Sequence, residues 1–381
     1  MISQTRIEQL LEAWVNQNSH TQNHAGVRMI LESFAHELAV CGMKVEWIDS
    51  IDTNQGQPPA LLATLGATTA TSSPVSTAAH APTFTFVSHA DTVFPIDSPF
   101  QKIKWSADRK IAIGPGVIDD KGGMLVILAA ISELASLADR PFSLQVICMP
   151  GEETGSSGFH SFLKKISASS DVVLGFEPSL PDGSIIHSRR GNRWYEIKMS
   201  GPGGHAGRDA GRVVNPLTEI SSKLAEMAKL TDVSRGVSVT PGSLQTNTTG
   251  FNSIPAEVTA RVDVRFDANS DRDALHARLL PLLAGTEWNC VEDCPAMSLN
   301  AESEAQAKTM LACITHEEGR SVSVVKATGS SDSNYLYRSG IPFIDGLGPC
   351  GNGLHSEQET LEVSTIGSRA RAVAKWVKNY I

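Results

Sequence analysis

The strongest constraint on the fold is a regular alternation of strand-like and helix-like segments over the first half of the chain. Three apolar runs have the length and composition of buried strands, namely 83–89, 142–150 and 171–178. Helical patterns lie between them, over 122–137 and 156–166. Strands that alternate with helices predict βαβ units, so we expect an α/β fold with a parallel sheet flanked by helices.

The pattern changes near residue 190. A strand, a helix, two strands and a second helix follow one another, over 193–201, 215–230, 236–246, 256–266 and 271–285. This order predicts an independent α+β unit of the β-α-β-β-α-β type. Helix–strand alternation then resumes near residue 300. We therefore expect a domain formed by residues 1–189 and 300–381, interrupted by an inserted domain formed by residues 190–299.

The charge and composition of the chain argue against several classes of partner. Its 381 residues carry 32 basic and 41 acidic side chains, a formal net charge of -9, which disfavours nucleic acid and anionic membranes. The sequence has no apolar stretch long enough for a transmembrane helix, and its first residues predict an amphipathic helix rather than a secretory signal. Six scattered cysteines, with Cys290 and Cys294 taken as structural, favour a cytoplasmic protein. The low-complexity segment 67–82 is expected to be an exposed loop, with no chemical role for His80.

Acidic and imidazole side chains gather where the predicted strands end. His89 and Asp91 stand two residues apart at the end of the 83–89 strand, so they share one face of it. A metal-bound imidazole usually has a carboxylate on its other nitrogen, and Asp91 is placed to provide it. The alternative for His89 is a core histidine whose hydrogen bonds are satisfied within the fold.

Two adjacent pairs of acids follow along the chain. Asp119 and Asp120 stand between glycine pairs, where two carboxylates are costly unless a cation bridged by Asp119 neutralises them; the alternative is a helix cap. Glu152 and Glu153 follow the 142–150 strand directly and point in different directions. One of them can bind a metal while the other acts as a general base, and a solvated loop is the alternative.

Two further residues complete the set. Glu177 ends the apolar 171–178 strand, where a carboxylate is expensive to bury unless it is paired or metal-bound. His355 lies in a glycine-rich loop that follows an apolar segment. All these positions fall at the carboxyl ends of strands or just after them, the edge at which open α/β sheets bind ligands. Two imidazoles and three carboxylates, with one glutamate to spare, suit a two-metal hydrolytic centre.

The order of these motifs resembles the M20 family of zinc-dependent amidohydrolases, which includes glutamate carboxypeptidases, acetylornithine deacetylases, succinyl-diaminopimelate desuccinylases and aminoacylases. The matching motifs are SHADTVFP, GPGVIDDKGG, GEE, FEP and HS, and the similarity spans roughly residues 84–360. SHADTVFP, GPGVIDDKGG and FEP are most similar to the glutamate carboxypeptidase branch. The resemblance implies a zinc-peptidase catalytic domain with a mixed, mainly parallel sheet, and a dimerisation or lid role for the inserted domain.

The resemblance also implies five metal ligands around two zinc ions. Asp119 would bridge the ions, with His89 and Glu177 completing one and Glu153 and His355 the other. Co²⁺ or Mn²⁺ could replace zinc, because carboxylate-rich sites accept several divalent ions.

Other residues would act on the reaction rather than on the metals. Glu152 would be the general base that takes a proton from the attacking water and passes it to the leaving amine. Asp91 would orient the neighbouring imidazole, and the peptide between Asp119 and Asp120 would be cis. Asp332, in TGSSDSNYL, is open between a supporting role at the site and a cap on the helix that follows.

Three residues of the inserted domain complete the resemblance. His205 in GPGGHAG would reach the active site of the partner in a homodimer and stabilise the oxyanion, with help from Asn252 in GFNSIP. Arg265 in DVRF would bind the substrate carboxylate bidentately, although a surface cation is the alternative. GPGGHAG lacks the spacing and the lysine of a phosphate-binding loop.

The expected reaction is hydrolysis of an amide or peptide bond in a small peptide or N-acyl amino acid with a free carboxylate. A carboxypeptidase that releases a C-terminal acidic residue leads, and an N-acyl amino acid deacylase or a dipeptidase is the alternative. A catalytically inactive binding protein that kept the fold is a further alternative, of a different class. Neither nucleic acid nor a membrane is expected as a partner.

Overall fold

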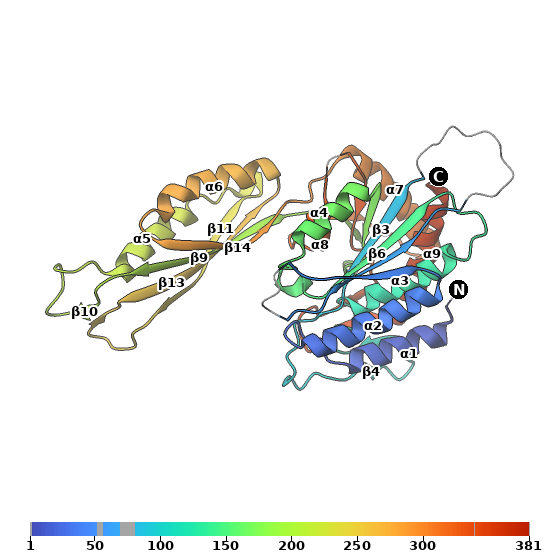
Figure 1. Cartoon of the computed structure of the whole chain (residues 1–381), viewed down its shortest axis with the longest axis horizontal. Helices are drawn as coiled ribbons and strands as arrows, with labels where there is room; N and C mark the ends of the chain where they lie inside the picture. The colour runs from blue at the N-terminus through green and yellow to red at the C-terminus, as the bar shows by residue number, and fades with distance from the viewer. Residues whose placement is uncertain (1, 52–55, 69–80, 339, 381) are drawn as a thin grey trace. The chain divides into compact units, whose positions relative to one another are not determined.

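The computed structural model describes residues 2–51, 56–68, 81–338 and 340–380, which divide into two compact units (Figure 1). The larger unit comprises Met1–Ser188, Leu299–Ala327 and Ser331–Ile381, and the smaller unit comprises Arg189–Ser298 and Thr328–Ser330. Most of the expected loop 67–82, including His80, lies outside the described residues. None of the helices within the described residues is long and apolar enough to cross a membrane.

Residues 328–330 belong to the smaller unit, whereas the expected domain boundaries placed them in the larger domain. Their contacts explain the difference. Arg189 Nη1 donates to the Gly329 carbonyl oxygen (3.3 Å), and Ser330 Oγ donates to Asn192 Oδ1 (2.7 Å). These contacts were not visible in the sequence because the partners stand 140 and 138 residues apart.

The larger unit is built on a six-stranded sheet of order β1-β2-β6-β3-β7-β16. The strands are β1 (Lys44–Ile48), β2 (Ala60–Leu65), β6 (Ser143–Met149), β3 (Thr83–His89), β7 (Val172–Gly175) and β16 (Phe343–Ile344). β3 pairs in parallel with β6 and β7, and β16 in parallel with β7, whereas β1 and β2 join antiparallel. Every residue of β3 is buried, which explains its continuous apolar run. The predicted α/β fold with a mixed sheet is confirmed.

Helices surround this sheet, and α1, α2, α3, α7 and α9 share one hydrophobic core with it. They are α1 (Gln4–Asn16), α2 (His24–Val40), α3 (Lys121–Leu134), α4 (His160–Ser169), α7 (Ala301–Glu318), α8 (Asp332–Leu336) and α9 (Val363–Asn379). α3 is buried over almost its whole length and packs against α1, α2, α9 and β3 (Figure 1). α4 packs against α8, which contacts β3 and β7.

Two smaller sheets complete the larger unit. One has the order β17-β18-β5-β4 and consists of β17 (Gly351–Asn352), β18 (Thr360–Glu362), β5 (Ile111–Ile113) and β4 (Lys104–Trp105). Its pairing of β18 with β5 brings residues 360–362 beside residues 111–113, just before the loop that carries Asp119. The other pairs β8 (Ile185–Arg189) with β15 (Val324–Ala327).

The smaller unit has a four-stranded antiparallel sheet of order β11-β13-β9-β14 with a core of its own. Its elements are β9 (Gly191–Ser200), β10 (Gly204–His205), α5 (Pro216–Ala228), β11 (Ser238–Thr246), β12 (Ser253–Ile254), β13 (Glu257–Phe266), α6 (Asn269–Leu283) and β14 (Glu287–Cys294). The main elements follow the expected β-α-β-β-α-β order. Alternate residues of β13, from Val258 to Phe266, are buried, as in a sheet with one face on a core.

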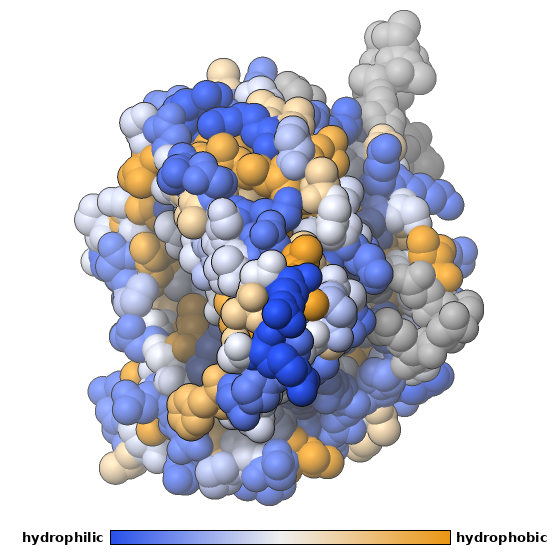
Figure 2. Space-filling model, turned by 90° about the vertical axis from the view of Figure 1, so that its left-hand side faces the viewer, coloured by the Kyte–Doolittle hydropathy of each residue, from blue (hydrophilic) through white to orange (hydrophobic). Residues whose placement is uncertain are grey.

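The surface of the molecule is mixed in polarity. Figure 2 shows a face on which hydrophilic side chains surround separate hydrophobic groups. Exposed hydrophobic residues of the smaller unit include Val214, Val233, Phe251 and Val291. Single exposed apolar side chains are normal on a folded protein and carry no functional meaning by themselves.

Candidate metal centre

The loop that carries Asp119 joins β5 to α3, and its local structure depends on glycine. The Asp119–Asp120 peptide is cis, as the resemblance implies. Asp120 occupies the N-cap of α3, but its side chain makes no capping hydrogen bond, so a helix cap does not explain this acidic pair. A β-carbon at Gly123 would collide with Asp120 Oδ1 and with the Phe176 carbonyl oxygen. Only glycine therefore lets the first turn of α3 lie this close to the end of β7.

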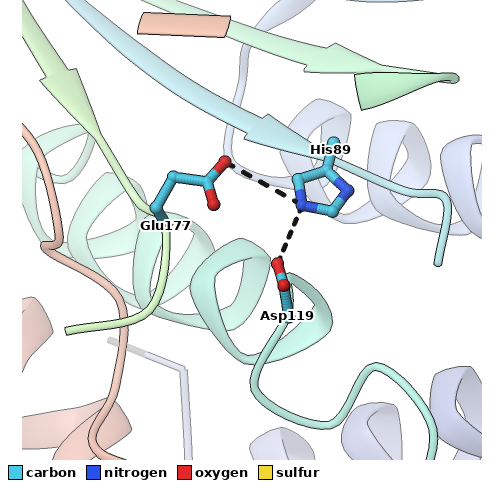
Figure 3. Close-up of side chains that lie close together, drawn as sticks. All are labelled: His89, Asp119 and Glu177. Atoms are coloured by element: carbon cyan, nitrogen blue, oxygen red, sulfur yellow. Dashed lines mark hydrogen bonds and ion pairs between the residues drawn. The ribbon is translucent and has the colours of Figure 1, made fainter. Parts of the chain in front are cut away.

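Three side chains from separate segments converge on one point (Figure 3). His89 ends β3, Asp119 precedes α3 and Glu177 follows β7. His89 Nε2 lies 3.0 Å from Asp119 Oδ1 and 3.9 Å from Glu177 Oε1. Because β3 and β7 are neighbouring parallel strands, their carboxyl ends bring His89 and Glu177 to the same edge of the sheet.

The second oxygen of Asp119 faces a second cluster. His355 Nε2 lies 3.2 Å from Asp119 Oδ2 and 3.3 Å from Glu153 Oε2. In each cluster the candidate ligand atoms lie within 4.8 Å of one another. His355 has a φ of 59°, in the left-handed region that non-glycine residues seldom adopt, and its side chain is 56% exposed. Asp119 thus offers one oxygen to each cluster, the arrangement of a bridging carboxylate.

Asp91 braces parts of the site that come from different segments. Its buried carboxylate accepts hydrogen bonds from Thr21 Oγ1 (2.6 Å), from the Glu152 N–H (3.0 Å) and from the Glu153 N–H (3.3 Å). His89 Nδ1 lies 3.3 Å from Asp91 Oδ1 and 3.1 Å from the Asp91 carbonyl oxygen. The same carboxylate therefore orients the imidazole and the short 3-10 turn that carries both glutamates.

The charges of the site depend on one another. Burial disfavours the charge on Asp119, but the imidazoles beside it hold its pKa below the ordinary value. In return, hydrogen bonds to Asp119 and Glu153 raise the pKa of His355 to about 10. Burial also opposes a charge on His89, yet its carboxylate neighbours raise its pKa, while burial raises the pKa of Glu152 and of Glu153. Positive charge at this site would stabilise its buried carboxylates, and a divalent cation would supply that charge.

The donor set fits divalent transition metals. Imidazole nitrogens and carboxylate oxygens are ligands that zinc takes in proteins. Glu153 Oε1 is buried and has no hydrogen-bond partner among the described residues, although a buried polar atom is costly unless a polar group, water or an ion meets it. Five side chains would hold two ions here: His89, Asp119, Glu153, Glu177 and His355.

The inserted-domain candidates all lie in the smaller unit. His205 on β10 is exposed, and its Nε2 lies 3.5 Å from Asn252 Nδ2, so the structure brings these two side chains together. The Gly207 N–H donates to His205 Nδ1 (3.1 Å). Arg265 lies on β13, where its Nε donates to both carboxylate oxygens of Asp263, at 3.0 and 2.9 Å. Arg265 therefore belongs to the four-stranded sheet, apart from the β10–β12 pair that carries His205.

Two supporting residues escaped the sequence reasoning or were left open by it. Glu359 is fully buried and accepts hydrogen bonds from the loop that carries Asp119. In the sequence it looks like the nearby Glu357, and no local pattern distinguishes the two. Asp332 is also buried, but Ser331 is the residue that caps α8, so the helix-cap interpretation of Asp332 is wrong.

Residues 85–379 match the sequence model of Peptidase family M20/M25/M40. Among characterised relatives, carboxypeptidase G2 of Pseudomonas sp. (strain RS-16) is 28% identical over 302 residues, which cover 76% of this chain and 72% of that protein. A succinyl-diaminopimelate desuccinylase of Magnetococcus marinus is 25% identical over 310 residues, covering 74% of this chain and 79% of the other.

Solved structures share the fold over the whole chain. A metallo-carboxypeptidase of the M20 family from Sulfolobus solfataricus superposes with a TM-score of 0.78 at 15% identity, covering 100% of this chain and 99% of the other. Aminopeptidase PepT from Bacillus cereus superposes with a TM-score of 0.76 at 20% identity, covering 99% and 98%. At such low identities the likeness concerns the fold.

Proposed function

This chain belongs to peptidase family M20/M25/M40 and is a metallohydrolase, and from that premise we propose that it uses two divalent ions, zinc by preference, to hydrolyse an amide bond in a small substrate with a free carboxylate. One observation supports the two-ion centre more than any other. The two oxygens of Asp119 face different imidazoles, His89 at 3.0 Å and His355 at 3.2 Å. Each imidazole has a further carboxylate beside it, so each half of the site has a ligand set of its own.

Metal ions in such a site polarise the scissile carbonyl and lower the pKa of the attacking water. Glu152 is the general base: it takes a proton from that water and later gives it to the leaving nitrogen, so the amide becomes a carboxylate and an amine. Burial raises the pKa of Glu152, which makes its carboxylate a stronger proton acceptor. The hydrogen bond from its N–H to Asp91 fixes the backbone from which it acts.

The substrate class we favour is a peptide or N-acyl amino acid with a C-terminal acidic residue. Similarity to a protein named carboxypeptidase G2 supports it, as does Arg265, which would bind the substrate carboxylate bidentately. Similarity to succinyl-diaminopimelate desuccinylases supports an N-acyl amino acid deacylase as the second candidate. A dipeptidase is a third possibility, and the full set of ligands and base counts against an inactive binding protein.

We extend the proposal to a homodimer assembled through the smaller unit. His205, with Asn252 beside it, would stabilise the developing oxyanion in the site of the partner subunit. The exposure of His205 supports a role toward something outside its own unit. No disulfide joins any of the six cysteines, all of which lie within the described residues, and this supports the cytoplasmic location that we also propose.

A matched substrate panel tests this function. Zinc-loaded protein would be assayed on N-acyl-glutamates, N-acetylornithine, N-succinyl-diaminopimelate, N-acetylated neutral amino acids and dipeptides, each with and without a chelator. We expect chelator-sensitive cleavage that is fastest with N-acyl-glutamates. Preference for N-succinyl-diaminopimelate or N-acetylornithine would establish the deacylase instead. Cleavage that survives complete metal removal would refute the two-ion mechanism.

A further inference from the structure

Glu359 makes an unusual set of contacts for a carboxylate in the larger unit. It is fully buried, and both of its oxygens accept hydrogen bonds from the backbone of one loop. Oε1 accepts from the N–H of Ile118 (2.9 Å) and of Asp119 (3.2 Å), and Oε2 accepts from the N–H of Gly116 (3.1 Å). The Glu359 carbonyl oxygen accepts a fourth hydrogen bond, from the Gly114 N–H (3.2 Å). One residue thus holds the loop that delivers the shared Asp119.

Glu359 also ends the loop that delivers His355. That loop closes on itself through the Ser356 hydroxyl, which donates to the Gly353 carbonyl oxygen (2.7 Å), and the Glu359 N–H donates to the Ser356 carbonyl oxygen (3.1 Å). Directly afterwards, β18 pairs with β5. Glu359 therefore links two loops that are about 240 residues apart in sequence, each of which carries a candidate ligand of the second cluster.

A second buried side chain, Lys121 at the start of α3, also contacts the Asp119 loop. Lys121 is 1% exposed, and its Nζ donates to the carbonyl oxygens of Gln17 (3.2 Å) and Pro115 (3.4 Å). Burial lowers the pKa of Lys121 to about 7 and raises the pKa of Glu359 to about 8. The loop is therefore held by a carboxyl group that accepts from three of its N–H groups and by an amine that donates to one of its carbonyl oxygens.

The two clusters depend on this link to different extents. His89 and Glu177 follow neighbouring strands of the main sheet, whose ladder fixes their spacing. His355 has no such support: it lies on an exposed loop, in the left-handed conformation. The distance from Asp119 to His355 is set where their two loops meet, and Glu359 is the side chain at that point.

We propose that Glu359 is a positioning residue that ties the Asp119 loop to the His355 loop and so holds the second cluster of Asp119, Glu153 and His355 in register for its ion. The proposal rests on the proposed two-ion function and adds to it a residue that is not a ligand. It distinguishes the two sites, because loss of Glu359 would weaken the second ion more than the first.

Glu359→Gln is the informative variant, since an amide keeps one acceptor oxygen but turns an N–H donor toward the backbone N–H groups. Glu357→Gln is the matched control, because Glu357 is exposed on the same loop. Zinc affinities would be measured by competition with a chromophoric chelator, and hydrogen exchange would be followed over residues 114–121. We expect Glu359→Gln to weaken one zinc ion by about 10- to 100-fold, as loss of outer-shell partners does, and to speed exchange in that segment. Glu357→Gln should resemble the unmodified protein in both measurements.

A double variant identifies which ion is affected. His355→Ala removes the second cluster and leaves one ion. If Glu359 acts through that cluster, adding Glu359→Gln to His355→Ala should change the affinity of the remaining ion by less than about threefold. An equal loss of both ions in Glu359→Gln, or a further large loss in the double variant, would overturn the proposal, because Glu359 would then only support the fold.

The proposed function and this inference fail in different ways. Unmodified protein that binds fewer than two ions would refute the two-ion centre, and with it the role of Glu359 toward the second ion. In that case hydrogen exchange still decides the link itself: unchanged exchange over 114–121 in Glu359→Gln would show that the loop does not depend on Glu359. Two bound ions with equal affinities in both variants would refute the inference alone.

Discussion

His89 in the larger unit and His205 in the smaller unit are imidazoles proposed to serve the same reaction, yet their surroundings are opposite. His89 is 1% exposed, with Nδ1 facing Asp91 and Nε2 facing Asp119. His205 is exposed, and the side chain beside it is an exposed asparagine, Asn252, at 3.5 Å. A metal ligand must be oriented before the ion arrives, so it is braced from both sides. A group that meets the substrate must stay open until the substrate is there.

Glu152→Gln should cause the largest loss of activity, and it tests the proposed catalytic residues of the larger unit. The amide cannot accept the proton of the attacking water, so kcat should fall by about 10²- to 10⁴-fold. Because Glu152 is not a ligand, two zinc ions should remain bound by elemental analysis. Glu357→Gln is the control for expression and folding. Normal turnover by Glu152→Gln, or loss of an ion from it, would mean that Glu152 has another role.

Arg265→Ala tests the residues of the smaller unit that are proposed to contact the substrate. Loss of a bidentate contact to the substrate carboxylate should lower kcat/KM by roughly 100-fold, or about 3 kcal/mol, mainly through KM. The metal content should not change. Arg261→Ala is the matched control, since Arg261 lies on the same strand and pairs with Glu196 at the surface. Equal losses on a substrate and on its carboxamide analogue would contradict carboxylate recognition.

Protons and metal ions should compete for the imidazole of His355 in the larger unit, but not for that of His205 in the smaller unit. The pKa of His355 is raised to about 10, so without metal this imidazole is mostly protonated at neutral pH, and an ion must displace that proton. Zinc affinity should therefore rise with pH by about tenfold per unit for each displaced proton. Calorimetry in buffers of different ionisation enthalpy measures the protons released. His355→Ala should release fewer, whereas His205→Ala should match the unmodified protein; equal release from His355→Ala would contradict the assignment.

The smallest expected effect comes from mixing two variants, and it tests whether His205 acts in the active site of a partner subunit. His205→Ala and Glu152→Ala chains, each inactive alone, should regain activity when mixed. Random exchange makes about half of the dimers mixed, each with one complete site, so activity should approach roughly a quarter of the unmodified level. Native mass spectrometry verifies the exchange. No recovery in verified mixed dimers would place His205 in its own subunit or outside the reaction.

Sequence alone could predict the residues that follow regular elements. His89 and Glu177 stand at the ends of buried apolar strands, and parallel pairing then leaves little freedom in where their side chains meet. The inserted unit could be predicted for a similar reason, because its alternation of buried and exposed residues is regular.

What the sequence could not provide was the set of contacts between distant segments. Glu357 and Glu359 are the same residue type two positions apart, but only Glu359 points at the Asp119 loop, about 240 residues away. The boundary at 328–330 has the same cause, since it depends on Arg189 and Asn192. Such contacts leave no local periodicity, so pattern reasoning cannot detect them.

The interrupted path of the chain has a consequence for the order of synthesis. All strands and helices of the smaller unit lie within residues 189–298, so that unit can fold as soon as this stretch has left the ribosome. The larger unit must wait longer, because β16, the His355 loop and α9 are made after the smaller unit. A nascent chain thus holds four of its five candidate metal ligands long before it holds the fifth, and the complete centre can form only after the His355 loop has been made.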